Sequence, residues 1–289
     1  MSRTLPAWIE LSRPGNVLMG AATCILGGFM VGMGPETYLA VTLGGLSVAL
    51  FMMAGNIVND IVDSDIDAKA HPYRPIPSGR ISKMLAKRLA IVAWTLSLLS
   101  MLGSTILLIS KELIWYVVPI IWGLAAILML TYDLGFASKN RGLMGNISIS
   151  LLVGLVIIFG AASTGNINNS LIWFVAATAL LINLSREIVK DCQDLHADEG
   201  RDTLPLSIGL ERSRMIAYVI ALAGIIFAAL PYYIDVLPMR WLVLQIPAIL
   251  LIISTNGLLS SGQDQKAQKS LRLGLLMGLI GFASSVSLS

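Results

Sequence analysis

Charged residues, cysteines and histidines are scarce in this chain of 289 residues. Only 13% of the residues are charged, against about 25% in an ordinary soluble domain, and this excludes a water-soluble globular protein. The two cysteines, Cys24 and Cys192, cannot form a disulfide framework or complete a zinc site by themselves. The net charge of +3 is too small and too scattered to indicate binding to nucleic acid.

Apolar residues are abundant instead, at 56% of the chain with a mean hydropathy of +0.79. They form long continuous runs, and a helix needs about 20 mostly apolar residues to cross a bilayer. Such runs exclude a β-barrel, whose strands alternate apolar and polar residues. We predict an all-α membrane protein with nine transmembrane helices in a single domain, residues 1–289. The predicted spans are Val17–Val31, Tyr38–Val58, Leu85–Ile109, Leu113–Tyr132, Met144–Ala162, Leu171–Ser185, Met215–Tyr233, Trp241–Leu259 and Leu271–Leu288.

The basic residues predict the orientation of these spans, because Lys and Arg accumulate in cytoplasmic loops. Of the 20 Lys and Arg residues, only Lys111 and Arg240 fall on the opposite side of a nine-helix topology. This predicts a multi-pass protein of the cell membrane with a cytoplasmic N-terminus. The long polar loops after the second and sixth spans, which would carry the active site, then lie on the cytoplasmic face.

Three aspartates occur at helical spacing at the end of the second predicted span. Asp60, Asp63 and Asp67 stand at positions i, i+3 and i+7, so on a continuous helix they share an arc of about 60°. Asn56 lies one turn earlier on the same side, whereas Asp65 points elsewhere. We therefore expect three carboxylates on one helical face.

The same offsets recur at the end of the sixth predicted span. Asp191, Asp194 and Asp198 again stand at i, i+3 and i+7, and Glu187 takes the place of Asn56. The third to sixth spans lie between the two clusters, which is an even number of crossings. Both clusters are therefore expected on the same membrane face, where they can face each other.

Carboxylates one helical turn apart repel each other, so a cation is expected between them. Mg²⁺ prefers oxygen ligands, takes one or two carboxylates from a protein and binds the phosphate oxygens of a substrate. The two clusters thus indicate a Mg²⁺-diphosphate clamp. Its predicted metal ligands are Asp60, Asp63, Asp67, Asp191, Asp194 and Asp198. One alternative is a pair of solvated helix ends, which the matching offsets disfavour. Another is a zinc site of His71, His196 and Cys192, which the surrounding carboxylates disfavour.

Basic residues near the two clusters are candidates for contacts with the diphosphate. Arginine matches phosphate with a planar fork, and lysine supplies a movable point charge. The nearest candidates are Arg74, Lys139, Arg186 and Lys190. For each of them singly, the alternative is the ordinary excess of basic residues in cytoplasmic loops.

These motifs resemble those of the UbiA superfamily of intramembrane prenyltransferases. Asn59, Asp60, Asp63 and Asp67 are similar to the family's Asn-Asp-x-x-Asp-x-x-x-Asp signature, and the chain continues with the family's Pro-x-Arg-Pro-x-Pro-Ser-Gly pattern at residues 72–79. The resemblance covers essentially the whole chain.

The second cluster is similar to the family's Asp-x-x-Asp-x-x-x-Asp motif, which runs on here to Thr203, Leu204 and Pro205. In this chain Asp202 offers a competing register for the third carboxylate. Tyr132, Lys139 and the Gly145–Asn146 pair resemble the family's segment after its fourth helix.

The resemblance implies Mg²⁺-dependent transfer of a prenyl group from its diphosphate to a lipophilic acceptor inside the membrane. The catalytic residues that it implies are Asp60, Asp63, Asp191, Asp194, Lys139 and Arg74. The substrate-binding residues that it implies are Asn56, Asn59, Arg74, Tyr132, Lys139, Arg141, Arg186 and Lys190.

Residues Ser185–Asp191 are similar to the archaeal digeranylgeranylglyceryl phosphate synthases. This implies a geranylgeranyl donor and geranylgeranylglyceryl phosphate as the acceptor in archaeal ether-lipid synthesis, with Arg141 or Arg186 near the acceptor phosphate. One alternative is prenylation of an aromatic acceptor in quinone or haem synthesis. Another is a membrane transporter, which is disfavoured because its acidic residues would lie near the bilayer midplane.

Two further regions give weaker signals. The polar stretch Ser261–Arg272 is interpreted as a cytoplasmic loop without a function. Glycines inside the predicted spans, such as Gly160 and Gly224, are expected to allow close helix packing rather than to mark a site.

Overall fold

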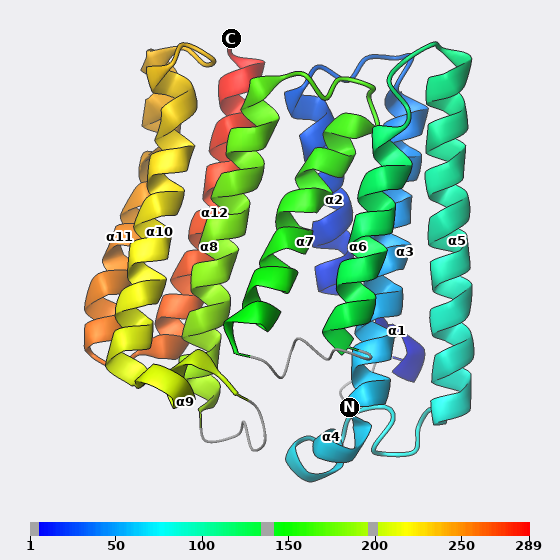
Figure 1. Ribbon diagram of the computed structural model, residues 1–289, viewed down its shortest axis with the longest axis vertical. Coiled ribbons are helices and arrows are strands. Elements are labelled where there is room, and N and C mark those ends of the chain that lie inside the picture. The colour runs from blue at the N-terminus through cyan, green and yellow to red at the C-terminus, as the bar shows by residue number, and fades with distance from the viewer. Residues whose placement is uncertain (1–5, 134–141, 196–201) are drawn as a thin grey trace. The chain divides into compact units, whose positions relative to one another are not determined.

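The computed structural model describes residues 6–133, 142–195 and 202–289. These residues are mostly helical and contain no β-strand, which confirms the all-α prediction (Figure 1). The elements are α1 (Ala7–Ser12), α2 (Pro14–Met30), α3 (Tyr38–Val62), α4 (Ser64–Ala70), α5 (Lys83–Ser110), α6 (Val117–Asp133), α7 (Leu143–Ala162), α8 (Ser170–Asp194), α9 (Leu204–Ile208), α10 (Leu210–Tyr233), the 3-10 helix η2 (Met239–Gln245), α11 (Ile246–Ser260) and α12 (Asp264–Ser287).

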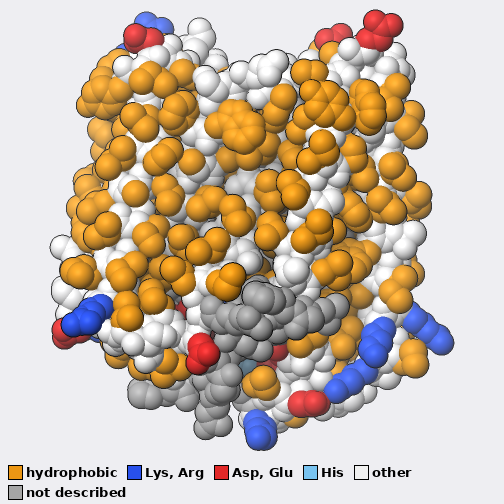
Figure 2. Space-filling view, viewed as in Figure 1, with side chains coloured by type: hydrophobic (Ala, Val, Ile, Leu, Met, Phe, Trp, Pro, Cys, Tyr) orange, Lys and Arg blue, Asp and Glu red, His pale blue; other side chains and the backbone are white. Residues whose placement is uncertain are grey.

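Each predicted span corresponds to a helix in the part of the chain that the structure describes. Seven helical segments are long and apolar enough to cross a membrane: α3, α5, α7, α8, α10, η2 with α11, and α12. The apolar helices α2 and α6 have 17 residues each, close to the lower limit for a span. Nine crossings and their orientation therefore stay predictions. Hydrophobic side chains cover the middle of the helices in Figure 2, and charged side chains gather at helix ends.

The first of two compact units comprises Met1–Gly28, Gly32–Leu124 and Phe159–Asn166. Its main contact is between α3 and α5, and α1 packs against α3. An apolar cluster joins these three helices and the loop after α4. Its buried members are Leu11, Ile57, Ile76, Ile81, Ala86 and Ala90.

The second unit comprises Phe29–Val31, Ala125–Ile158 and Ile167–Ser289. Here α8 packs against α10 and α12, and α11 packs against α12. Gly224 of α10 permits close packing against α8, as predicted for glycines inside the spans. A Cβ on Gly224 would lie 2.5 Å from Cδ1 of Ile182. The buried members of its core are Ile182, Ile188, Val189, Ala217, Ala221, Ile252, Leu259, Ala267 and Leu271.

The interpretation of Ser261–Arg272 as a loop was wrong for most of its length. Only the first residues form a turn, and α12 begins at Asp264. Asp264 is buried and accepts two hydrogen bonds from the Arg214 guanidinium, at 2.8 and 2.6 Å. This ion pair with a helix that is distant in the sequence stabilises the polar start of α12. The local sequence alone resembles that of a loop.

Candidate active site

The first acidic cluster lies where α3 ends, and here one expectation needs correction. The helix does not run through all three aspartates, because α3 ends at Val62 and α4 begins at Ser64. The Ser64 hydroxyl donates to the Ile61 carbonyl at 2.9 Å, a local side-chain bond of the kind that competes with helix continuation. Asp60, Asp63 and Asp67 are nevertheless all buried, at 6%, 9% and 5% exposure.

Arg13 contacts this cluster, although no motif in the sequence indicated it as a site residue. It occupies the left-handed C-cap position between α1 and α2, with φ of 52°, and its guanidinium forms an ion pair with Asp60. Beside it, the Asn56 side chain donates to the Ser12 carbonyl at 2.9 Å. Arg13 and Asp60 are 47 positions apart in the sequence, so no local pattern predicts the pair.

Arg74 is a candidate that the structure places at the first cluster. Its guanidinium donates to Asp67 at 2.6 Å, and the carboxylate side chain of Asp67 is only 7% exposed. Buried carboxylates are costly unless they are paired. Arg13 and Arg74 therefore neutralise the first and third aspartates of the cluster.

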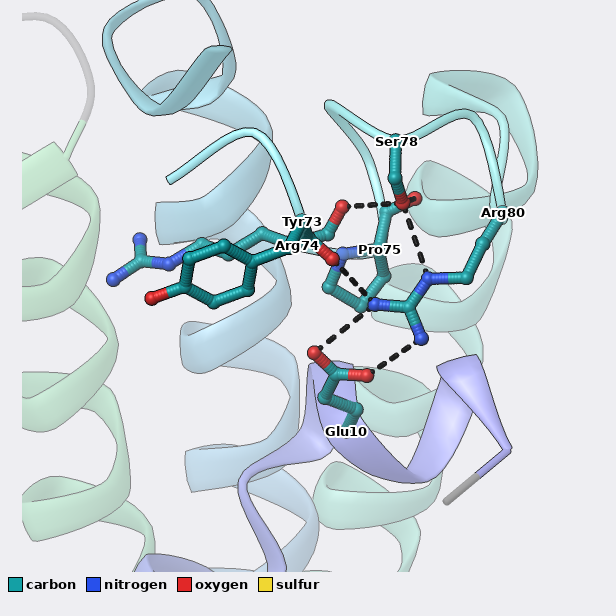
Figure 3. Close-up of polar contacts among 6 residues, drawn as sticks. All are labelled: Glu10, Tyr73, Arg74, Pro75, Ser78 and Arg80. Carbon is teal, nitrogen blue, oxygen red and sulfur yellow. Dashed lines mark hydrogen bonds and ion pairs between the residues drawn. The ribbon is translucent and has the colours of Figure 1, made fainter. Parts of the chain in front are cut away.

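Arg80 links the loop after α4 to α1, as Figure 3 shows. Its guanidinium donates to both carboxylate oxygens of Glu10, at 2.8 and 3.1 Å. These hydrogen bonds raise the pKa of Arg80 above its usual value. Nearby, Lys83 donates to Asp65 at 3.0 Å and lowers the pKa of that exposed carboxyl. Asp65 thus lies off the buried cluster, as predicted.

The second acidic cluster lies in the last turns of α8. Asp191 and Asp194 are half-buried, and the Asn146 side chain on α7 donates to Asp191 at 2.7 Å. The contact between α7 and α8 continues with Asn183, which donates to the Ser150 hydroxyl at 3.2 Å, and this hydroxyl donates to the Asn146 carbonyl at 2.7 Å. Asn146 is therefore fixed on both its backbone and its side chain.

Two of the predicted basic residues lie close to the carboxylate of Glu187. Arg186 forms an ion pair with it, and Lys190 lies 3.8 Å away one turn later. The side chain of Glu187 is 13% exposed, against 48% for Lys190. Lys190 thus keeps an exposed ammonium group beside the second cluster.

The remaining predicted site residues lie partly inside and partly outside the described part of the chain. Asn59 is half-buried near the end of α3, and Tyr132 is half-buried near the end of α6. Lys139, Arg141 and Asp198 lie outside the described residues, so their assigned roles stay predictions. Asp202 is exposed just before Thr203, the N-cap of α9.

The described side chains fit a hard divalent cation that keeps part of its own coordination shell. The first cluster offers only carboxylate oxygens, which suit Mg²⁺. No three His, Cys, Asp or Glu side chains among the described residues converge to hold a metal by themselves. Mg²⁺ takes one or two carboxylates from a protein and completes its octahedron with water and phosphate oxygens.

A family model for UbiA prenyltransferases matches residues 20–282. The chain belongs to the UbiA prenyltransferase family. It is 32% identical to a digeranylgeranylglyceryl phosphate synthase of Methanopyrus kandleri, over 97% of this chain and 99% of that protein. It is also 32% identical to the synthase of Korarchaeum cryptofilum, over 96% of both chains. This UbiA protein is therefore a prenyltransferase and a multi-pass integral membrane protein.

Solved structures have the same fold as this UbiA protein. A structure of a digeranylgeranylglyceryl phosphate synthase in membranes matches it with a TM-score of 0.78 and 26% identity, over 98% of each chain. A UbiA homologue from Archaeoglobus fulgidus, bound to DMAPP and Mg²⁺, matches with a TM-score of 0.66 and 17% identity, over 98% of this chain and all of that one.

Proposed function

We propose that this protein transfers a geranylgeranyl group from its diphosphate to geranylgeranylglyceryl phosphate in the cell membrane, as a step of archaeal ether-lipid synthesis that depends on Mg²⁺. Relatives that carry the name digeranylgeranylglyceryl phosphate synthase, about 30% identical over nearly the full chain, support this acceptor. The A. fulgidus homologue with DMAPP and Mg²⁺ supports the donor class and the metal.

The observation that carries the chemistry is the buried carboxylate cluster of Asp60, Asp63 and Asp67, with Arg13 and Arg74 paired to its outer members. A site that binds a metal-diphosphate complex needs anionic groups for the metal and cations for the phosphates. Carboxylates and guanidinium groups lie here in contact. When the ligand binds, the carboxylates can bind the metal and the guanidinium groups can bind the phosphates.

The two acidic clusters are the proposed metal-binding residues of the enzyme. The proposed ligands are Asp60, Asp63, Asp67, Asp191, Asp194 and Asp198. When bound there, Mg²⁺ neutralises the diphosphate and makes it a better leaving group. The proposed ligand set draws on both acidic motifs and stays a prediction from the sequence.

The cationic side chains act on the diphosphate itself. Arg74, Lys139 and Lys190 stabilise the negative charge that grows on it as the allylic C–O bond breaks. The apolar helices exclude water from the allylic cation and hold the isoprenoid tail. The acceptor hydroxyl then attacks the allylic cation to form the ether C–O bond, and its proton passes to the released diphosphate.

The other substrate-binding side chains have lesser roles in the proposal. Asn56, Asn59 and Tyr132 contact the bound substrates from the ends of α3 and α6. Arg141 and Arg186 provide charge for the phosphate of the acceptor, which an aromatic acceptor would not need.

The test is an assay of detergent-purified protein with geranylgeranyl diphosphate, with and without Mg²⁺, and mass detection of products. Geranylgeranylglyceryl phosphate and an aromatic acid are offered as acceptors in parallel. Mg²⁺-dependent prenylation of the glyceryl phosphate supports the proposal. An aromatic product alone would retain the ionisation chemistry and overturn the acceptor. No product with either acceptor, from protein that binds the donor, would overturn both.

A further inference from the structure

The loop between α4 and α5, residues 71–82, carries Arg74 and has a defined shape. Pro72, Pro75 and Pro77 fix their own φ angles, and Gly79 adopts a φ of +74° that favours glycine. Backbone hydrogen bonds close the loop, from Ser78 N–H to the Arg74 carbonyl and from Ile81 N–H to the Pro75 carbonyl, both at 3.0 Å.

Two apolar side chains anchor this loop independently of its polar contacts. Ile76 and Ile81 are buried, at 7% and 6% exposure, in the cluster that includes Leu11 of α1 and Ile57 of α3. The attachment of the loop to the unit therefore does not depend on any one ion pair.

Arg80 organises the polar side of the loop (Figure 3). Besides its two bonds to Glu10, its guanidinium donates to the Tyr73 carbonyl at 2.6 Å and to the Ser78 hydroxyl at 3.1 Å. The Ser78 hydroxyl in turn donates to the Arg74 carbonyl at 2.6 Å. Arg80 thus holds, directly or through Ser78, the carbonyls of both peptide groups that flank the Cα atom of Arg74.

Arg74 itself points away from this network. Its guanidinium leaves the loop on the side away from Arg80 in Figure 3 and pairs with Asp67. Pro75 further restricts the backbone of Arg74 to extended conformations. The peptide groups that carry the Arg74 side chain are therefore held by Arg80 together with the backbone hydrogen bonds from Ser78 N–H to the Arg74 carbonyl and from Arg74 N–H to the His71 carbonyl.

We propose that Glu10 and Arg80 are positioning residues of the prenyl-transfer reaction. The bridge from α1 to Arg80 holds the peptide groups on either side of Arg74, and so places the Arg74 guanidinium at the first acidic cluster. Arg80 does not bind the diphosphate, because its guanidinium already makes four hydrogen bonds within the protein. This inference rests on the proposed function, in which Arg74 contacts the diphosphate.

If the Glu10–Arg80 ion pair only stabilised the fold, its loss would lower the melting temperature. The side chains of Arg80 and Glu10 are 37% and 36% exposed, and exposed ion pairs contribute little to stability. Loss of the bridge is therefore expected to leave the melting temperature nearly unchanged. Misplacement of Arg74 is expected to weaken donor binding instead, because small displacements of a binding group reduce its contribution strongly.

The experiment compares Glu10→Ala, Arg80→Lys, Arg74→Ala and the double variant Glu10→Ala/Arg74→Ala as full-length protein in detergent. KM for geranylgeranyl diphosphate, kcat and the melting temperature are measured for each. Lys87→Gln is the matched control, since Lys87 is an exposed cation near the start of α5 that has no described hydrogen-bond or ion-pair partner. Arg80→Lys keeps the charge but loses the planar fork.

Glu10→Ala and Arg80→Lys are each expected to raise KM by about tenfold, with an unchanged melting temperature and a normal Lys87→Gln control. In the Arg74→Ala background, Glu10→Ala is expected to raise KM no further, since both act through one group. An unchanged KM in Glu10→Ala, or full additivity in the double variant, would overturn the positioning role and leave the proposed function intact. A normal KM in Arg74→Ala would instead remove Arg74 from the proposed site.

Discussion

The side chain of Asn146 on α7 donates a 2.7 Å hydrogen bond to the Asp191 carboxylate on α8. Asn146 is itself buried, and its carbonyl accepts a bond from Ser150. The second acidic cluster is therefore oriented by a neighbouring helix, and one of its carboxylates has a fixed direction before any ligand binds.

We expect Asn146→Ala to weaken the use of Mg²⁺ without unfolding the protein. Groups that orient a metal ligand contribute about 10- to 100-fold in metal affinity or activity, so the Mg²⁺ concentration for half-maximal turnover should rise by at least about tenfold. A Mg²⁺ titration of product formation measures this. Thr178→Ala on α8 is the control, because its hydroxyl donates to the Phe174 carbonyl of its own helix. An unchanged Mg²⁺ titration would remove Asn146 from the site.

The aspartates of the first cluster should be required for turnover. Asp60→Asn and Asp63→Asn are each expected to reduce turnover by at least about 100-fold, because a direct ligand contributes no less than the groups that orient it. Chelation with EDTA should abolish activity, and added Mg²⁺ should restore it. The matched control is Asp65→Asn, since Asp65 is exposed and paired with Lys83. Full activity in Asp60→Asn would falsify the clamp.

The helices could be predicted from the sequence because each depends on a local run of apolar residues. The same argument placed the first acidic cluster at the end of α3. It did not predict the break at Asp63, because the helical spacing of the aspartates continues across it. The break lies in the backbone of Asp63, whose ψ of 2° departs from helical values, and spacing alone does not reveal it.

The pairs that complete the candidate site were beyond local patterns. Arg13 and Asp60 are 47 residues apart, and Glu10 and Arg80 are 70 apart. Closeness in sequence to the aspartates predicts Arg74 as a neighbour of the cluster, but it does not predict Arg13. A buried carboxylate near the end of a span needs a partner, but its sequence position does not say which one.

The pair of Arg214 on α10 and Asp264 on α12 should matter for stability rather than for catalysis. Its side chains are 19% and 8% exposed, and removal of one partner leaves the other charge buried without compensation. Arg214→Ala and Asp264→Ala are each expected to lower the free energy of unfolding by about 3 kcal/mol. The double variant should lose clearly less than the sum of the two.

Thermal unfolding of the detergent-solubilised variants measures this effect. Arg272→Ala is the control, because Arg272 is an exposed cation on α12 without a described ion pair. If Arg214→Ala and Arg272→Ala melt at the same temperature, the pair contributes no stability and the other contacts of α12 hold the helix.

Gly160 should tolerate no side chain, because α2 and α7 approach each other at this residue. A Cβ built on it would lie 2.7 Å from the carbonyl carbon of Cys24 and would overlap the carbonyl oxygen. These are backbone atoms that no rotamer change can move, so Gly160→Ala is expected to lower the free energy of unfolding by about 3 kcal/mol or more. Gly123→Ala on α6 is the opposite case, since no atom lies within 4 Å of its Cβ position and helix propensity favours alanine by about 1 kcal/mol. Melting temperatures should therefore fall in Gly160→Ala and stay level or rise in Gly123→Ala. Equal melting temperatures would mean that the two helices can separate at this point without loss, and close packing at Gly160 would then have no role in stability.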